Sequence, residues 1–245
     1  MAGEPVYTAV EMTAKAMSRF QGVKTSRKGL ENIPAEGGAV LAVNHTGYLD
    51  FIQLGLAVSA AGRRMRIMAK RELANNKVLG FLMRGCGVIE VDRAAGADAY
   101  AEAVNRLRAG ELVTVYPEAT ISRSFEIKAF KSGAARMAIQ ADVPIVPAIV
   151  WGAQRIATKG KPRHLGRHHF PVSVAFGTPI EPHEPAATLT ETLRNEMVAM
   201  LHRVQEDFDH PAGAYWVPRR LGGTAPTLEE AAEMDRRDAE KRRTS

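Results

Sequence analysis

The chain has 245 residues, a formal net charge of +6 and 45% hydrophobic residues. This length fits one large domain or two small ones, and it is enough to bury a sizeable core. The single cysteine, Cys86, cannot form an intramolecular disulfide, which excludes a small secreted scaffold held together by disulfides.

The N-terminal segment predicts an amphipathic helix and not a signal peptide. Apolar side chains recur every three or four residues over residues 6–20, which is the spacing of one helix face. Charged residues, among them Glu4, Glu11 and Lys15, interrupt the apolar core that a signal peptide needs. No run along the chain reaches the roughly 20 apolar residues of a membrane-spanning helix. We therefore expect no transmembrane helix, and a first helix that packs on the domain or lies in a membrane interface.

From residue 37 onward, short β-rich runs alternate with helical stretches. The predicted strands cover residues 39–43, 65–69, 88–91, 112–115, 145–150 and 172–176. The predicted helices cover residues 50–60, 71–84, 97–108, 132–140 and 189–208. This alternation is typical of an α/β layered domain, in which helices flank a mostly parallel central sheet.

The alternation stops after Pro211. Residues 226–245 contain six acidic and five basic side chains, so this segment is nearly neutral and the excess positive charge lies in the preceding part of the chain. We expect a polar tail or a peripheral helix here, and not a second domain.

The first stretch whose residues could carry out catalysis runs from Asn44 to Asp50. His45 follows the predicted strand 39–43, and Asp50 begins the next predicted helix. Ligands of open α/β sheets bind at the carboxyl ends of the strands. A carboxylate that accepts one ring N–H of a histidine selects its tautomer and supports the imidazolium that forms when the other nitrogen takes a proton. The pair predicts a general base, and a structural or helix-capping pair is the alternative.

Two later stretches also end predicted strands. Arg93 follows strand 88–91, where a guanidinium can bind a phosphate with two hydrogen bonds or pair with a neighbouring carboxylate. Glu118 and Thr120 follow strand 112–115, and Lys131 comes shortly after them. A carboxylate, a hydroxyl and an amine suit recognition of a polyol phosphate, although a simple turn is the alternative.

Taken together and in this order, these stretches resemble the motifs of the glycerolipid acyltransferases that acylate 1-acyl-glycerol 3-phosphate. The first motif, a histidine and an aspartate separated by four residues, matches His45 and Asp50. The other matches are Lys70, Glu72, Leu73, Asp92 and Arg93 in the second motif, Pro117, Glu118, Thr120, Phe130, Lys131 and Gly133 in the third, and residues 143–147 in the fourth. The resemblance covers residues 25–180.

The resemblance implies an acyltransferase catalytic domain over residues 31–210. An amphipathic helix and its lead-in precede it over residues 1–30, and a polar tail follows over residues 211–245. His45 is then the catalytic base and Asp50 its orienting partner. The implied residues for binding the acceptor and its phosphate are Lys70, Arg93, Glu118, Thr120 and Lys131.

The third motif departs from the family pattern at two positions. Ala119 stands where the family has glycine, and Ile121 stands where it has an arginine that is expected to hold the acceptor phosphate. An aliphatic side chain cannot replace that arginine. Arg123 is one alternative phosphate ligand, and Lys70, Arg93 and Lys131 form another set. An acceptor without a terminal phosphate is the third alternative.

The resemblance also implies the reaction. A fatty acyl group passes from acyl-CoA, or from an acyl-carrier protein, to the sn-2 hydroxyl of lysophosphatidic acid and gives phosphatidic acid in phospholipid synthesis. Another lysophospholipid or a glycolipid is the alternative acceptor, and a lipid or thioester hydrolase is a further alternative. Acyl-CoA is a co-substrate here, so we expect no cofactor and no metal.

The lipid substrates imply a membrane surface as a partner, because the acceptor and the product partition into bilayers. We expect a peripheral protein at the cytoplasmic face of the membrane, docked by the helix at residues 6–20 and the basic run at residues 63–71. Nucleic acid is not expected, since only 6% of residues are aromatic and no basic run alternates with stacking side chains. His164, His168 and His169 lack nearby Cys, Asp or Glu ligands and predict a solvated basic loop.

Overall fold

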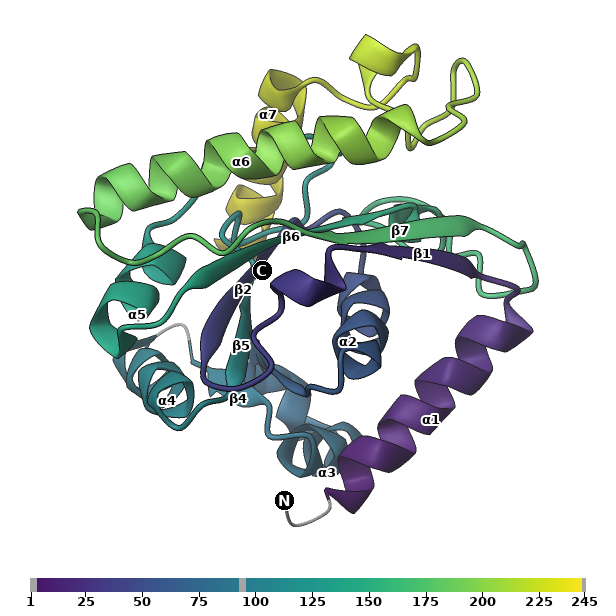
Figure 1. Ribbon diagram of the computed structural model, residues 1–245. Coiled ribbons are helices and arrows are strands. Elements are labelled where there is room, and N and C mark those ends of the chain that lie inside the picture. Colours follow the sequence, from purple (N-terminus) through teal and green to yellow (C-terminus); the bar gives the residue numbers. More distant parts are fainter. Residues whose placement is uncertain (1–3, 93–95, 244–245) are drawn as a thin grey trace.

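This computed structural model describes residues 4–92 and 96–243 of the chain. Helices cover both faces of a central sheet (Figure 1). The strands are β1 (Lys24–Lys28), β2 (Ala39–Val43), β3 (Met65–Lys70), β4 (Ile89–Val91), β5 (Leu112–Val115), β6 (Ile145–Trp151) and β7 (Pro171–Phe176). The helices are α1 (Pro5–Phe20), α2 (Asp50–Ala60), α3 (Lys77–Gly85), α4 (Gly96–Arg108), α5 (Gly133–Ala141), α6 (Ala186–Glu206) and α7 (Leu228–Arg243).

The sheet has the strand order β1-β7-β6-β2-β5-β3-β4 within the described residues. Neighbouring strands run parallel except β6 and β7, which are antiparallel. The predicted α/β layered domain with a mostly parallel sheet and an N-terminal helix is therefore confirmed. Parallel neighbours β2, β5 and β6 all end at the same edge of the sheet, so the loops that follow them meet there.

The central strand β2 shows why its sequence is apolar throughout. Val40 and Ala42 point into the core that α4, α5 and α6 cover, whereas Leu41 and Val43 point into the core beneath α2. Successive side chains of a strand face opposite sides, and both sides of this sheet are covered by helices. A five-residue apolar run without alternation is the expected result.

The helix α1 packs against α2 and α3 (Figure 1). Met12 and Phe20 on its outer side remain 65% and 69% exposed. Among the helices of residues 4–92 and 96–243, none is both long enough and apolar enough to cross a membrane.

Two elements differ from the sequence prediction. The strand β1 is not predicted, because its residues are polar and mostly exposed and it joins the sheet only as an edge beside β7. The helix predicted over residues 71–84 starts later, since the Asn76 side chain accepts hydrogen bonds from the backbone N–H groups of Val78 and Leu79 and caps α3. Arg71–Asn75 forms a separate 3₁₀ turn.

Within the predicted polar tail, α7 is a regular helix. Thr227 and Glu230 begin it with reciprocal hydrogen bonds between each side chain and the other residue's backbone N–H. This is a capping box, which satisfies backbone donors at the start of a helix. Among the described side chains of α7, only Ala231 is buried.

Candidate active site

The loops after β2 and β5 meet through backbone contacts around His45. The backbone N–H of Ser122 donates to the carbonyl oxygen of His45 at 2.7 Å, and the His45 N–H donates to Glu118 Oε1 at 2.9 Å. The His45 ring lies 4.1 Å from the Tyr116 ring, centroid to centroid. The parallel pairing of β2 with β5 therefore brings the first and third sequence motifs together at one edge of the sheet.

His45 and Asp50 form a pair, as their spacing predicts. His45 Nδ1 lies 3.3 Å from Asp50 Oδ2, and the Asp50 side chain is fully buried. The same oxygen accepts hydrogen bonds from the backbone N–H groups of Thr46 at 2.8 Å and Gly47 at 2.7 Å. The ionised carboxylate of Asp50 can only accept hydrogen bonds. Nδ1 of His45 therefore carries the proton that it donates to Asp50, and Nε2 of His45 keeps a free lone pair. The His45 side chain is 22% exposed, which allows a substrate to reach it.

Residues of β6 and of the segment after it hold the loop that follows β2. The Asn44 side chain donates to the Val150 carbonyl at 3.1 Å and accepts from the Val150 N–H at 2.7 Å, which extends the pairing of β2 with β6. The Thr158 hydroxyl donates to the Thr46 carbonyl at 2.6 Å. No sequence signal identifies Thr158, because its partner lies more than a hundred residues away along the chain.

The Glu118 side chain holds the backbone of the loop that carries His45. One carboxylate oxygen accepts from the His45 N–H, and the other accepts from the backbone N–H of Lys128 at 3.2 Å. Burial raises the pKa of Glu118 to about 7, against the opposing effect of these two hydrogen bonds and of the Lys128 charge. The position explains why a carboxylate is present in the third motif. The acceptor-binding role predicted for Glu118 stays a prediction.

The raised pKa of Glu118 predicts a pH dependence of stability. Between the ordinary value of 4.5 and about 7, the folded protein holds a proton that the unfolded chain has lost. The free energy of unfolding should therefore fall as pH rises through this window, with a slope on the order of 1 kcal/mol per pH unit. Urea unfolding at a series of pH values, on the wild type and on Glu118→Gln, measures this slope. The variant cannot titrate there, so parallel curves for the two proteins would contradict the prediction.

The other predicted acceptor-binding residues are spread around this edge. Thr120 and Lys131 are exposed after β5, and Lys70 is exposed at the end of β3. Arg93 lies outside the described residues, so its predicted role has no structural counterpart. Ile121 is 6% exposed and belongs to the interior, not to the surface that a phosphate could reach.

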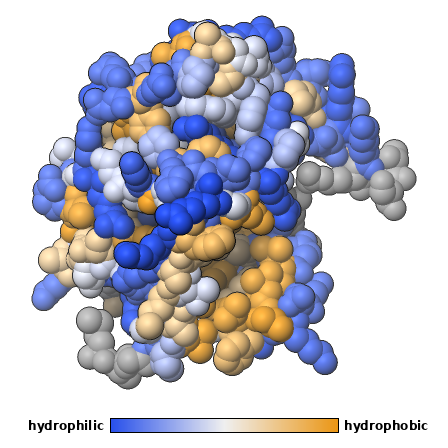
Figure 2. Space-filling view, turned by 90° about the vertical axis from the view of Figure 1, so that its right-hand side faces the viewer, coloured by the Kyte–Doolittle hydropathy of each residue, from blue (hydrophilic) through white to orange (hydrophobic). Residues whose placement is uncertain are grey.

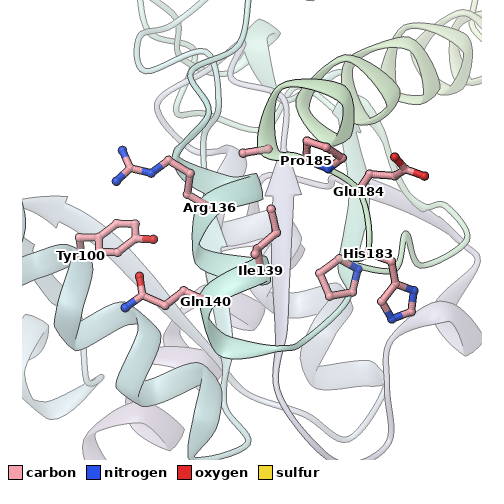
Figure 3. A pocket seen from close by; sticks show the side chains of 9 residues that line it. Tyr100, Arg136, Ile139, Gln140, His183, Glu184 and Pro185 are labelled. Carbon is pink, nitrogen blue, oxygen red and sulfur yellow. The ribbon is translucent and has the colours of Figure 1, made fainter.

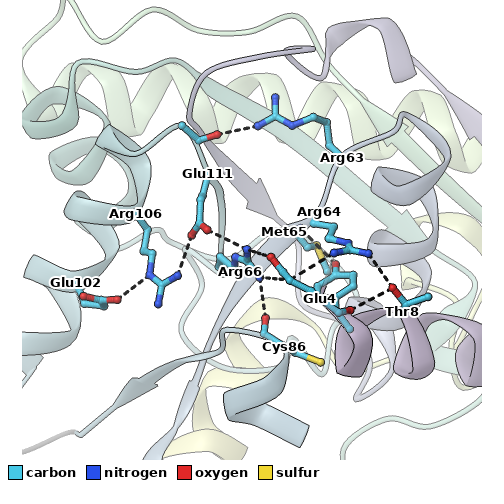
Figure 4. Close-up of polar contacts among 12 residues, drawn as sticks. Glu4, Thr8, Arg63, Arg64, Met65, Arg66, Cys86, Glu102, Arg106 and Glu111 are labelled. Atoms are coloured by element: carbon cyan, nitrogen blue, oxygen red, sulfur yellow. Dashed lines mark hydrogen bonds and ion pairs between the residues drawn. The ribbon is translucent and has the colours of Figure 1, made fainter. Parts of the chain in front are cut away.

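In the basic run at residues 63–71, Arg63, Arg64 and Arg66 contact other parts of the protein, whereas Lys70 and Arg71 are exposed. Arg66 is buried and pairs with Glu4 at 2.6 Å and Glu111 at 2.9 Å (Figure 4). Arg63 donates to backbone carbonyls, and Arg64 bonds to the Thr8 hydroxyl. These arginines join the start of α1 to β3 and to the start of β5. Carboxylates distant in sequence pair with Arg64 and Arg66, and the sequence of the run alone does not reveal these partners.

An apolar cavity of about 490 Å³ lies among α1, α2, α3 and β3. Figure 2 shows a recess within a broad apolar surface on this side of the molecule. Its lining includes Val10 and Met17 of α1, Phe51 and Gly55 of α2, Ile67 of β3 and Leu82 of α3. Phe51 directly follows Asp50, so the cavity extends to the first turn of α2 beside the His45–Asp50 pair.

A second, shallower hollow of about 540 Å³ lies away from this pair (Figure 3). Tyr100, Arg136 and Gln140 line it together with residues 182–186, which lead into α6. The end of α5 that borders it returns the chain to the start of β6. It therefore lies toward the amino ends of the parallel strands, whereas His45 lies at their carboxyl ends.

The sequence of this chain is similar to those of known proteins. Residues 24–151 match the family model described as Acyltransferase. The chain is 30% identical over 189 residues to a 1-acyl-sn-glycerol-3-phosphate acyltransferase of Bacillus subtilis, a match that covers 76% of this chain and 91% of that protein. It is also 30% identical over 192 residues to a bovine 1-acyl-sn-glycerol-3-phosphate acyltransferase alpha, covering 76% of this chain and 66% of the bovine protein.

The fold is also similar to that of a solved structure. The crystal structure of the 1-acyl-sn-glycerophosphate acyltransferase from Thermotoga maritima superposes with a TM-score of 0.67 at 19% sequence identity. The match covers 86% of each chain.

Proposed function

Because this chain belongs to the Acyltransferase family, we propose that it transfers a fatty acyl group from a thioester to the sn-2 hydroxyl of 1-acyl-glycerol 3-phosphate, giving phosphatidic acid. The observation that carries the proposal is the His45–Asp50 pair at the carboxyl edge of the sheet. The names of the Bacillus and bovine relatives support this acceptor. Another lysophospholipid or a glycolipid is the alternative acceptor, because Ile121 replaces the arginine expected for the phosphate.

In the proposed reaction, Nε2 of His45 takes the proton of the acceptor hydroxyl. Asp50 holds the ring through Nδ1 and stabilises the positive charge that develops on it. The hydroxyl oxygen adds to the thioester carbonyl carbon to form a tetrahedral intermediate. The intermediate collapses, the carbon–sulfur bond breaks, and the leaving sulfur takes the proton from His45. The products are an ester and a free thiol, so the step needs no oxidant or metal.

The apolar cavity is the proposed site of the acyl chain. Its volume of about 490 Å³ lies within the range of roughly 300–1,000 Å³ that is usual for ligand sites. It reaches Phe51, the residue after Asp50, and has apolar walls, which suits an alkyl chain attached to a carbonyl that reacts at His45. Its depth sets the chain length that the enzyme accepts.

The cavity predicts an effect of Gly55→Leu on chain length. A Cβ at this position would lie 3.2 Å from the end of the flexible Met65 side chain, so the larger residue enters the cavity instead of striking backbone. Displacing about two buried methylenes of the acyl chain costs about 1.6 kcal/mol, or more than tenfold in kcat/KM. We expect kcat/KM for palmitoyl-CoA to fall by at least this factor, while octanoyl-CoA is used as before.

The matched control places leucine on the same helix outside the cavity. Ala60 is exposed at the end of α2 and does not line the cavity. Ala60→Leu should leave the ratio of the two donors unchanged. An equal loss of both donors in Gly55→Leu would contradict this position for the acyl chain.

The membrane is the proposed source of the lipid substrates. Helices α1 and α3 flank the cavity and carry exposed apolar side chains, namely Met12, Phe20, Val78, Leu79 and Phe81. Such a surface beside an apolar cavity lets an alkyl chain pass from the bilayer to the site without contacting water (Figure 2). In this proposal the apolar surface of α1 and α3 replaces the arginines of residues 63–66 as the docking element.

Docking through α3 predicts a loss of vesicle binding in a double variant. Val78 and Phe81 are 69% and 58% exposed, so Val78→Ser with Phe81→Ser removes surface apolarity without opening the core. Each such side chain gains about 1.5–3 kcal/mol when buried, so the double variant should bind vesicles more than tenfold less tightly. Co-sedimentation with phosphatidylglycerol vesicles measures this. Leu165→Ser, at a 52% exposed position outside these helices, is the control and should bind like the wild type.

The proposed function is tested by assaying the purified chain with several acceptors and both donors. Palmitoyl-CoA and palmitoyl-acyl-carrier protein are each offered with lysophosphatidic acid, lysophosphatidylcholine and a glycolipid, and the products are read by lipid mass spectrometry. We expect phosphatidic acid as the main product. An ester of a different acceptor would establish the alternative substrate, and release of free fatty acid without any ester would identify a hydrolase.

A further inference from the structure

We propose that Arg123, Lys128 and Lys159 form a binding site for a phosphate group of a substrate. Helix α7 occupies this site with Asp235 and Asp238, and the phosphate must displace them. The substrate identity rests on the proposed function, whereas the anion site and its occupation by α7 do not.

The contacts of this cluster are short and shared. Asp238 pairs with Arg123 at 2.6 Å and with Lys159 at 2.9 Å. Asp235 pairs with Lys159 at 2.8 Å and with Lys128 at 3.4 Å. The three basic side chains are only 12–18% exposed, so they are held in place beneath α7 and do not extend freely into solvent.

The cluster is connected to the loop that carries His45 through Thr120 and Glu118. The Lys128 amine donates to the Thr120 hydroxyl at 2.5 Å, and Thr120 belongs to the third motif. The backbone N–H of Lys128 donates to Glu118, whose other oxygen accepts the N–H of His45. These contacts place the cluster on the same edge of the sheet as His45, where a substrate that reacts at His45 would present its phosphate.

The charge of the cluster fits a phosphate. Hydrogen bonds from Lys159 and Arg123 lower the pKa of Asp238 to about 2, so this carboxylate is ionised at neutral pH. Burial opposes ionisation of Asp235, but hydrogen bonds and charges of the lysines hold its pKa below the ordinary value. Two carboxylates carry the same charge as a phosphate monoester, which has about −1.5 to −2 at pH 7.

Apart from the pairs of Asp235 and Asp238 with the cluster, the helix α7 has few contacts that hold it. Ala231 is its only buried side chain among those described, and its other polar contacts include the exposed pair of Arg219 with Glu230. An exposed ion pair such as this one contributes little to stability, so a phosphate that replaces the two aspartates leaves few contacts to hold α7 on the folded domain. Lys159 and α7 lie beyond residues 24–151, so the cluster adds to the part of the chain that matches the family.

Hydrogen exchange on the full-length wild type tests the displacement without any mutation. Glycerol 3-phosphate and CoA are the phosphate ligands, and glycerol and pantetheine are their phosphate-free counterparts. Calorimetry first sets the saturating concentrations. We expect backbone amides of residues 228–241 to exchange faster with a phosphate ligand and to be unchanged by its counterpart. No binding of either phosphate ligand, or unchanged exchange at saturation, would overturn the inference.

A pair of double variants separates competition from general charge. Asp235→Asn with Asp238→Asn removes the carboxylates that contact the cluster. If α7 is undocked in about one tenth of molecules, this variant binds phosphate ligands about tenfold more tightly. Glu229→Gln with Glu233→Gln is the control, since it changes net charge equally on the same helix without touching the three basic residues. Equal tightening in both double variants would overturn the inference.

A third variant shows that the basic residues themselves bind the ligand. Lys159→Gln, added to the Asp235→Asn and Asp238→Asn changes, should reverse the tightening, with circular dichroism checking the fold. Tightening for glycerol 3-phosphate alone assigns the site to the acceptor headgroup, and tightening for CoA alone assigns it to the donor. A chain that acylates lysolipids but shows neither effect refutes this site and leaves the proposed function standing. Phosphate binding with both effects but without acyl transfer supports this site and refutes the proposed function.

Discussion

Replacing His45 with alanine should lower kcat for acyl transfer by about 10²–10⁴-fold, which is the usual contribution of a positioned general base. Without the imidazole, nothing at this position takes the hydroxyl proton as the oxygen attacks the thioester. The fold should survive, because the structural contacts of His45 to Glu118 and Ser122 use its backbone N–H and carbonyl. Lipid mass spectrometry measures the rate, and thermal unfolding measures the stability.

The control for this variant is a histidine at a distance from the pair. His183 is exposed and lines the shallow hollow at the other edge of the sheet, so His183→Ala should react like the wild type. Near-normal acyl transfer by the folded His45→Ala variant would contradict the mechanism.

Asp50→Asn should lower kcat by on the order of 10⁴-fold, as the loss of a buried orienting carboxylate does in other histidine-based sites. The amide keeps the shape but carries no charge to stabilise the imidazolium. Asp50 Oδ2 also accepts the N–H groups of Thr46 and Gly47, and hydrogen bonds to a charged group are roughly twice as strong as neutral ones. The variant should therefore also unfold at a lower temperature, unlike His45→Ala.

A double variant shows whether the two residues act together. Groups that act as a unit have non-additive effects on kcat. His45→Ala combined with Asp50→Asn should be no slower than His45→Ala alone. Multiplied losses in the double variant would mean that Asp50 acts independently of the histidine.

Local patterns predicted most of the fold and the pairing of His45 with Asp50. The strand at residues 39–43 and the helix at residues 50–60 occur with the predicted bounds, because apolar runs and helical spacing reflect burial on two faces or on one. His45 and Asp50 are five residues apart at a strand–helix junction, so a short turn suffices to bring them together. The edge strand β1 shows the limit of such patterns, since its polar residues join the sheet only through backbone pairing.

Residue types and their order by themselves determined the α/β layers, the position of the His45–Asp50 pair and the family resemblance. These features depend on periodicity and on neighbours within a few residues, which the chain carries locally. The tertiary structure decided which charges are free. Arg66 is neutralised by Glu4 and Glu111, and Arg123 by Asp238. Partners of this kind come together only when distant elements pack, and an apolar cavity among four elements arises in the same way.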